Sequence, residues 1–353
     1  MEYRKKLTDL TENVLSQGAS DLHLIAGSRP ITRVAGSLTT LLSEPELTDA
    51  DLSGLLGELL NAEQKKVFLA TKEADFAWTY GAKARFRGNA YFERGRIGIA
   101  LRLIPQQIKT LAELNLPSVL ETFAARRQGF FIVVGPVGQG KTTTLASMIE
   151  LINTTRTEHI ITIEDPIEYL FTNKKSVIDQ REVRIDTADF QTALQGVFRQ
   201  DVDVVMIGEM RTPETIATAV TAAETGHLVL STLHTNNAAQ TIDRIIDSFP
   251  SIQQEQIRLQ LASSLAGIFS QRLVPRIAGG LIPVYELLVN NDAVGNLIRE
   301  KRTHEIQTVI ETGSSEGMLD MNRSLAELVR TGEISVETAY ARSWDPKTLE
   351  RLL

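Results

Sequence analysis

The 353-residue chain contains no cysteine. This absence excludes disulfide bridges, zinc centres built on thiolates and cysteine nucleophiles, and it fits a reducing compartment such as the cytosol. Long apolar runs are also missing: the longest, GFFIVVGPVG at 129–138, is about half of the roughly 20 residues that a membrane helix needs. No apolar segment follows the basic residues of MEYRKKLTDL, so no secretory signal is predicted. We therefore expect a cytoplasmic protein without a membrane span.

Positive charge is scarce as well. The 37 Lys and Arg residues are outnumbered by 44 Asp and Glu residues, which gives a formal net charge of −7. Proteins that bind nucleic acid usually carry a basic surface, and single-strand binders interleave it with aromatic residues. The chain has no such stretch, so a nucleic-acid translocase is disfavoured and no direct nucleic-acid partner is expected. The hydrophobic share of 42% is ordinary for a globular protein, and the length predicts about two domains.

The first 104 residues have the pattern of a small α+β domain with an antiparallel sheet. Strand 83–93 alternates small or apolar residues with arginines and other polar residues, as in a sheet with one face in water. Residues 105–114 are expected to form a linker. The elements predicted in this part are helices at 2–17 and 48–70 and strands within 18–27 and at 74–80, 83–93 and 96–104.

Residues 115–353 follow a different pattern, in which strands and helices alternate. This alternation predicts an α/β domain with a mostly parallel sheet covered on both faces. From about 237 onward the pattern is largely helical, with one β-like interruption at 269–289. The other elements predicted here are strands at 129–135, 159–165, 203–209 and 227–234 and helices at 141–153, 188–198 and 214–224.

The segment GPVGQGKT at 135–142 matches the phosphate-loop pattern G-x-x-x-x-G-K-[ST] between a predicted strand and a predicted helix. Its glycines let backbone N–H groups face the phosphates, Lys141 neutralises phosphate charge, and the Thr142 hydroxyl can ligate Mg²⁺. The glycine spacing does not fit a dinucleotide-binding turn. We therefore predict ATP and Mg²⁺ as ligands. The expected nucleotide-binding residues are Gly135, Pro136, Val137, Gly138, Gln139, Gly140, Lys141, Thr142 and Thr143.

Acidic residues end two of the predicted strands. Glu164 ends HIITIE, where a carboxylate at the nucleotide edge of the sheet can orient the attacking water. The strand of VVMIGEMRT, 204–212, ends in Gly208 and Glu209, although a metal-binding Asp is usual at such a strand end. Asp203 is expected at the far end of this strand. Glu209 is therefore the expected metal-site acid, and the alternative for both glutamates is an ordinary surface acid.

Two histidines frame the segment HLVLSTLH, and arginines cluster in the first domain. At a strand end beside the nucleotide, His234 could hydrogen-bond the γ-phosphate, whereas a structural role remains the alternative for both His227 and His234. Their spacing does not fit a zinc site. The arginines either form a solvated or nucleic-acid-facing basic surface or supply charge to phosphates as arginine fingers do. They are Arg85, Arg87, Arg94, Arg96 and Arg102.

In combination and in this order, the phosphate loop, ITIEDPIEY, IGEMR and TGHLVLSTLHTNNA resemble the secretion ATPases of type II secretion and type IV pili. The resemblance covers nearly the whole chain and includes SDLHL at 20–24 and QREV at 180–183. It implies a PAS-like N-terminal domain, a RecA-like P-loop ATPase domain, and a homohexamer that couples ATP hydrolysis to mechanical work.

The same resemblance assigns roles to residues. Glu164 would be the catalytic base, Glu209 the Walker B acid, and His227 and His234 the histidine box. Arginines of the N-terminal domain would reach nucleotide across the ring. Thr212 stands where the family usually has Asp.

Within this family the chain resembles the retraction ATPases of type IV pili. Extension ATPases carry an added N-terminal domain and a four-cysteine zinc module, which this chain lacks. AVGNLIRE at 293–300 resembles the retraction signature AIRNLIRE, with Val294 and Gly295 in place of Ile-Arg. The implied partners are an inner-membrane pilus platform protein, the pilus machinery and a paralogous retraction ATPase, which implies work at the inner face of the inner membrane.

Four alternatives stay open at this point. The chain could be an accessory paralogue of the retraction ATPase, an extension or type II secretion ATPase, a nucleic-acid translocase, or a scaffold that does not hydrolyse ATP. The helix expected at AVGNLIRE could contact a partner, or its apolar residues could only pack against the rest of the domain.

Overall fold

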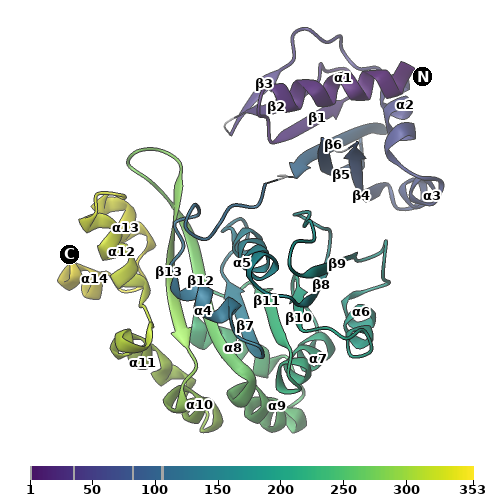
Figure 1. Ribbon diagram of the computed structural model, residues 1–353. Helices are drawn as coiled ribbons and strands as arrows, with labels where there is room; N and C mark the ends of the chain where they lie inside the picture. Colours follow the sequence, from purple (N-terminus) through teal and green to yellow (C-terminus); the bar gives the residue numbers. More distant parts are fainter. Residues whose placement is uncertain (1, 35, 82, 105–106) are drawn as a thin grey trace. The chain divides into compact units, whose positions relative to one another are not determined.

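The computed structural model describes residues 2–34, 36–81, 83–104 and 107–353. The chain divides into two compact units, Met1–Gln107 and Ile108–Leu353, each described here by itself (Figure 1). The expected linker 105–114 begins with two residues outside the described part, so its role as a linker stays a prediction. Among the described residues, no helix is both long and apolar enough to cross a bilayer.

The N-terminal unit is an antiparallel sheet with helices packed on one face. The apolar residues of β5 alternate with its polar ones, and Phe86 and Ala90 lie in the core beneath the helices. Strands β2 and β3 were not predicted, because four-residue strands give little periodic signal. In sheet order the strands are β3 (Ser37–Thr40), β2 (Ile31–Val34), β1 (Asp21–Ile25), β6 (Arg96–Ile104), β5 (Ala84–Glu93) and β4 (Glu73–Tyr80).

The single helix predicted at 48–70 is two helices, α2 (Asp49–Leu59) and α3 (Ala62–Thr71), which follow α1 (Glu2–Ser16). The break is made by Asn61, whose side chain accepts a hydrogen bond from Gln64 N at 2.8 Å. Gln64 in turn accepts from Asn61 N at 3.0 Å, which completes a capping box. The prediction of helix was right in type, and the cap was the signal for the break.

The C-terminal unit contains a seven-stranded sheet that is parallel except for the pairing of β12 with β13. This confirms the predicted α/β fold with a mostly parallel sheet. Strand β9, which contains the first three residues of QREV, was not predicted as a strand. In sheet order the strands are β13 (Leu281–Val289), β12 (Leu265–Pro275), β7 (Gly129–Val134), β11 (Leu228–Leu233), β10 (Val204–Ile207), β8 (His159–Glu164) and β9 (Val177–Glu182).

Helices cover both faces of this sheet (Figure 1). Phe131 and Val133 of β7 pack with α4 and α5 on one face, and Phe130 and Ile132 pack with α6 to α11 on the other. The C-terminal helices α12 to α14 form a smaller core with the β12–β13 pair. The helices are α4 (Val119–Ala124), α5 (Lys141–Thr155), α6 (Phe190–Val197), α7 (Pro213–Glu224), α8 (Ala238–Asp247), α9 (Ser251–Ser264), α10 (Asp292–Arg299), α11 (Ile306–Thr312), α12 (Met321–Arg330), α13 (Val336–Arg342) and α14 (Pro346–Leu352).

The direction of the strands decides where a site can form. β7, β11, β10 and β8 are mutually parallel neighbours, so the segments that follow them all leave the same edge of the sheet. Ligands of open α/β sheets bind outside this carboxyl edge. The phosphate loop, HTNNA, GEMR and DPIEY are the segments that begin there.

Candidate active site

The phosphate loop leaves β7 through glycines in conformations that other residues avoid. Gly138 and Gly140 have φ values of 76° and 78°, in the left-handed region, and α5 begins directly afterwards at Lys141. Gly135 has φ 150°, and a Cβ on it would lie 2.3 Å from the carbonyl oxygen of Gln271 on β12. Glycine is therefore required at position 135 by the close approach of a neighbouring strand.

Lys141 lies buried within the curl of the loop. Its Nζ donates hydrogen bonds to the carbonyl oxygens of Gly135 at 2.9 Å and Pro136 at 2.8 Å. Burial lowers the pKa of Lys141, while the charges of Glu209 and Glu168 act in the opposite direction. A buried cation at the positive N-terminus of a helix is suited to binding phosphate.

Glu209, His234 and Lys141 form a connected polar chain at the carboxyl edge. His234 follows β11, and its Nδ1 lies 3.3 Å from Lys141 Nζ. Its Nε2 lies 3.4 Å from Glu209 Oε2, and Glu209 also pairs with Arg211. The structure thus brings the predicted Walker B acid and His234 to the lysine predicted to bind phosphate.

The glycine at position 208 has a steric reason. A Cβ there would lie 3.3 Å from the carbonyl oxygen of Ile163 on the neighbouring strand β8. Its own carbonyl accepts a hydrogen bond from Thr232 Oγ1 on β11 at 2.5 Å. The backbone is packed between two strand ends at the place where an Asp was first expected, and the acid follows one residue later.

Glu164 is buried at the end of β8. Thr162 Oγ1 and Gln180 Nε2 donate to its Oε1 at 2.7 and 3.2 Å, and Glu168 N donates to Oε2 at 3.3 Å. Burial raises the pKa of Glu164 to about 7, although these hydrogen bonds act to lower it. A carboxyl group that titrates near neutral pH is suited to accept and release a proton during catalysis.

The β8 loop is tied directly to the first turn of α5. Strand β8 is separated from β7 by β10 and β11, so strand adjacency alone does not bring Glu164 to the phosphate loop. The Tyr169 hydroxyl, in the segment after β8, lies 2.8 Å from Thr143 Oγ1. This contact places the acid segment against the helix that begins with Lys141.

The structure corrects the role expected for His227. This residue precedes β11 and therefore lies at the amino edge, about 23 Å along the strand from His234 at about 3.3 Å per residue. Its Nδ1 lies 2.9 Å from Ala222 O, and its ring packs edge-on against Phe198. His227 is thus a packing residue, not part of the nucleotide site of its own subunit.

Asp203 also lies at the amino edge, as predicted. Asp203 immediately precedes β10, and its Oδ2 accepts a hydrogen bond at 2.8 Å from the backbone N of His159, the first residue of β8. It cannot substitute for Glu209 at the opposite edge.

The arginines predicted to contact nucleotide belong to the N-terminal unit, where Arg96 and Arg102 form ion pairs with aspartates. Arg96 forms a two-pronged contact with Asp49, with both distances 2.9 Å. Arg102 Nε donates to Asp21 at 2.8 Å, yet 71% of the Arg102 side chain is exposed. Arg102 lies directly opposite Arg87 on β5, and Arg85 is two residues from Arg87 on the same strand. A role for these arginines at a nucleotide stays a prediction.

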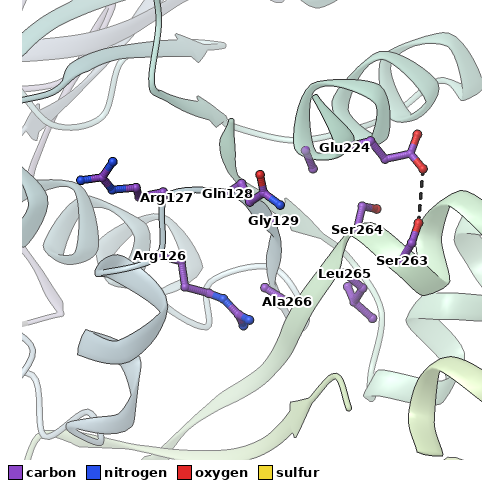
Figure 2. A pocket seen from close by; sticks show the side chains of 10 residues that line it. Arg126, Arg127, Gln128, Gly129, Glu224, Ser263, Ser264, Leu265 and Ala266 are labelled. Atoms are coloured by element: carbon purple, nitrogen blue, oxygen red, sulfur yellow. Dashed lines mark hydrogen bonds between the residues drawn. The ribbon is translucent and has the colours of Figure 1, made fainter. Parts of the chain in front are cut away.

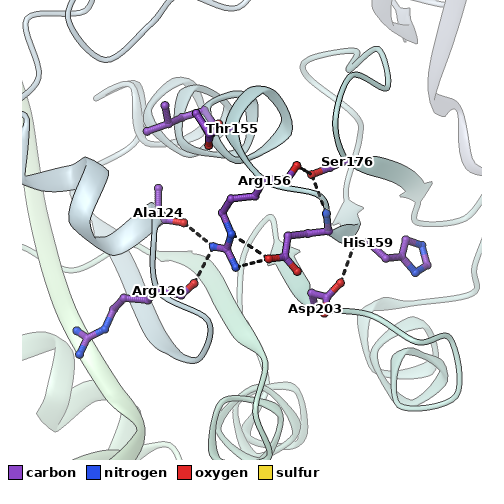
Figure 3. Close-up of polar contacts among 9 residues, drawn as sticks. Ala124, Arg126, Thr155, Arg156, His159, Ser176 and Asp203 are labelled. Atoms are coloured by element: carbon purple, nitrogen blue, oxygen red, sulfur yellow. Dashed lines mark hydrogen bonds and ion pairs between the residues drawn. The ribbon is translucent and has the colours of Figure 1, made fainter.

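Two large hollows lie away from the predicted catalytic residues, at the amino edge of the C-terminal sheet. One of about 570 Å³ is lined by Arg126, Arg127 and residues at the ends of α7 and α9 (Figure 2). Near the other, of about 840 Å³, Arg156 donates to the carbonyls of Ala124 at 2.6 Å and Arg126 at 2.7 Å and fastens the end of α4 (Figure 3). Neither hollow adjoins the phosphate loop.

A smaller hollow of about 220 Å³ does adjoin the phosphate loop. Gly140 and Thr143 line it together with apolar side chains from β12, β13 and the segment before α4, among them Leu116, Leu273 and Leu281. A nucleotide on the loop would have apolar and polar surface beside it, as small-molecule sites generally do.

The sheet order, the phosphate loop and the acids at the carboxyl edge define a RecA-like P-loop ATPase. The chain matches the type II/IV secretion system proteins over residues 98–341 and belongs to this family. It is 41% identical to the type IV pilus retraction ATPase PilT of Pseudomonas aeruginosa, over 97% of this chain and 99% of the relative. It is 39% identical to the type IV pilus ATPase PilU of the same organism, over 97% and 89%.

A solved structure agrees with these relatives. The crystal structure of the pilus retraction motor PilT with bound ADP has a TM-score of 0.91 to this chain at 43% identity, and the match covers 97% of this chain and 98% of the other. These similarities confirm the predicted family, fold and ATP hydrolysis, and they support the predicted pilus retraction function. They also establish nucleotide binding at the level of the family.

Proposed function

We propose that this protein is the hexameric motor that uses ATP hydrolysis to drive type IV pilus retraction, and thereby pilus disassembly and twitching motility. The observation that carries the proposal is the connected chain Lys141–His234–Glu209 beside the buried Glu164, in a chain similar to PilT along nearly its whole length. Each part of that constellation has a role in phosphoryl transfer.

The side chains divide the chemistry among them. Lys141 and the N–H groups of the phosphate loop bind the β- and γ-phosphates. Glu164 orients the attacking water and accepts its proton, which its pKa of about 7 allows at neutral pH. His234 contacts the γ-phosphate. Hydrolysis removes this contact, and the loop that carries His234 can then shift, as in other phosphate-held switches.

The residues present fit Mg²⁺ bound together with a nucleotide. Within the described ranges, no group of three or more His, Cys, Asp or Glu residues could hold a metal by itself. Mg²⁺ commonly takes one or two protein oxygens and completes its shell with phosphate and water. Thr142 and Glu209 would be those protein ligands. The bound ion supplies charge neutralisation to the phosphates.

In the proposed hexamer, arginines of the N-terminal unit would contact nucleotide across a subunit boundary. Arg87 and Arg102 lie directly opposite each other on neighbouring strands, so both belong to one region of the N-terminal sheet. We place Arg85, Arg87 and Arg102 at the nucleotide of a neighbouring subunit. Arg96 is a weaker candidate, because its guanidinium already donates two hydrogen bonds to the Asp49 carboxylate.

The partners follow from the proposed work. The motor would act on an inner-membrane platform protein of the pilus from the cytoplasmic face. A paralogue related to PilU would be a further partner. Because PilU itself is 39% identical to this chain, an accessory retraction ATPase is the second candidate function.

Gene deletion tests the direction of work. Loss of a retraction motor leaves cells hyperpiliated and unable to twitch, whereas loss of an extension motor leaves bald cells. An accessory role predicts retracting pili that generate less force. Strong stimulation of the purified ATPase by DNA would instead support a nucleic-acid translocase and count against the pilus role.

A further inference from the structure

Strand β12 holds the phosphate loop through side chains that sequence analysis missed. Gln271 is 3% exposed, and its Nε2 donates to Gln139 O at 2.7 Å. Its Oε1 accepts from Thr144 Oγ1, in the first turn of α5, at 2.6 Å. The Gln139 side chain also contacts β12, because its Oε1 accepts a hydrogen bond from Leu273 N at 2.7 Å. One glutamine of β12 therefore spans the last part of the loop and the start of its helix.

Side chains on the opposite face of β12 contact the loop that carries His234. Ser270 Oγ donates to Asn236 O at 2.7 Å, and Arg272 donates to Asn236 Oδ1 at 3.0 Å. Directly across the sheet from Ser270 lies Glu286 of β13, whose Oε1 accepts from Ala238 N at 2.9 Å. Asn236 and Ala238 are two and four residues beyond His234.

The pleat of β12 explains why alternate residues of this strand contact two different loops. Successive side chains of a strand point to opposite faces of the sheet. Phe269 packs in the core with α4 and α5, and Ile268 packs in the core with α6 to α11. Gln271 and Leu273 share the side of Phe269, where α5 begins. Ser270 and Arg272 share the side of Ile268, where α8 begins. β12 lies next to β7 in the sheet (Figure 1), so both loops pass its carboxyl end.

We propose that β12 sets the phosphate loop and the histidine loop in register with each other, with Gln271 as the positioning residue for the first and Ser270 as the positioning residue for the second. The inference rests on the proposed nucleotide site. It assigns two separable effects to adjacent residues: Gln271 governs how tightly phosphates bind, and Ser270 governs how fast bound ATP is hydrolysed.

Gln271→Met keeps the volume of the side chain and removes both hydrogen bonds. We expect the Kd for ADP, measured by titration calorimetry, to rise about tenfold, because two buried hydrogen bonds that shape the loop are lost. Ser270→Ala should leave the Kd for ADP within about twofold and lower kcat for ATP about tenfold, because it removes one of the contacts that position only the loop proposed to contact the γ-phosphate. The split between binding and turnover is a result that general destabilisation would not produce.

Matched substitutions elsewhere serve as controls. Gln307 donates to Asp320 at 2.7 Å on α11, and Ser343 donates to Asn322 at 2.7 Å near α13. Gln307→Met and Ser343→Ala should leave both the Kd and kcat unchanged. If Gln271→Met does not fold, Gln271→Glu replaces it: a carboxylate can still accept from Thr144 but cannot donate to Gln139 O, so weaker ADP binding is again expected.

Wild-type affinity for ADP in the Gln271 variants would overturn the inference, and so would a loss of ADP affinity in Ser270→Ala equal to that in Gln271→Met. Lys141→Ala separates this failure from failure of the proposed site. If Lys141→Ala abolishes binding while the Gln271 variants bind normally, the nucleotide site stands and only the role of β12 falls. If Lys141→Ala binds ADP normally, the site itself is misplaced.

Discussion

At the scale of single residues, burial gives Glu164 its chemical character. An exposed glutamate is fully ionised at neutral pH and is a weak base, whereas Glu164 is 3% exposed and has its pKa raised to about 7. Three donors keep its oxygens oriented while burial sets the pKa. The same carboxyl group can therefore take a proton from water and release it within one catalytic cycle.

Replacing Glu164 with Gln should abolish turnover while nucleotide binding is retained. Glutamine fills the same space but cannot accept the proton of the attacking water, so we expect kcat to fall by at least about 100-fold. The measurement is steady-state ATPase activity together with ADP binding. Unchanged turnover in this variant would favour a scaffold, or a different base.

Thr162→Val should move the pH dependence of ATPase activity. Thr162 Oγ1 donates to Glu164 Oε1 at 2.7 Å and so favours the ionised form. Removing the donor raises the pKa of Glu164 further, and since the base must be ionised, the acid limb of the kcat/KM profile should shift to higher pH. The ionisation of ATP is common to both proteins and cancels in the comparison. Superimposable profiles would show that Glu164 does not control this limb.

Of the two departures from the family pattern, Thr212 has a local explanation. Thr212 is the N-cap of α7, and its Oγ1 accepts from Thr215 N at 3.3 Å. Thr and Asp both cap helices, so the substitution keeps the structural role of that position. Gly295 is buried on α10, where a Cβ would lie 3.4 Å from Ala262 O of α9 and 3.4 Å from Arg299. A Cβ at this position would make ordinary van der Waals contacts, so the structure gives no steric reason for glycine there.

At the scale of elements, helix α10 contains the segment that resembles the retraction signature. One of its faces packs against the rest of the domain, and the other is exposed. Val294, Leu297 and Ile298 are buried in the core with α9 and α11, so the apolar side is used in packing. Asn296 and Arg299 contact each other on the exposed side. Any partner contact made by this helix must therefore use its polar face.

Glu286 on β13 should make stability depend on pH. It is 0% exposed, and burial raises its pKa to about 8. In the unfolded chain the Glu286 carboxyl has a pKa near 4.5. Between pH 4.5 and 8 the unfolded state therefore binds fewer protons than the folded state. The free energy of unfolding consequently falls as pH rises through that window.

Glu286→Gln removes this dependence and keeps an acceptor for Ala238 N. The melting temperature of the variant minus that of the wild type should increase steadily from about pH 5 to pH 8. Each 1 kcal/mol difference in unfolding free energy corresponds to about 2–4 °C. Thermal melts at several pH values give the comparison, and Glu333→Gln, at a partly exposed ion pair with Arg276, is the control. A constant difference between the two proteins across this range would mean that Glu286 is not titrating in the folded state.

The elements also show what the sequence could and could not predict. The phosphate loop, Glu164 and Glu209 lie in short segments whose spacing indicates their chemistry, so the sequence alone could predict them as site residues. His227 and His234 stand symmetrically around one strand, and only the parallel direction of β11 decides that His234 is at the site. Gln271 is 132 residues from Gln139, and no local pattern reports that β12 lies beside β7.

At the scale of the whole molecule, a hexamer would complete a site that one subunit leaves to its neighbour. Arg102→Ala should lower kcat about 100-fold or more if its guanidinium stabilises charge on a neighbouring nucleotide. Native mass spectrometry should still detect hexamers. Asp21→Asn frees the Arg102 side chain from its ion pair and is the matched control, for which we expect activity to be retained. Full activity in Arg102→Ala would remove this arginine from the nucleotide site.

The central claim is that hydrolysis at this site retracts pili. Its most direct measurement is live imaging of fluorescently labelled pili in the native cell, with the gene replaced by the Glu164→Gln allele. We predict pili that extend at the normal frequency and do not retract. Retraction at the wild-type rate in these cells, or the loss of extension instead, would contradict the account.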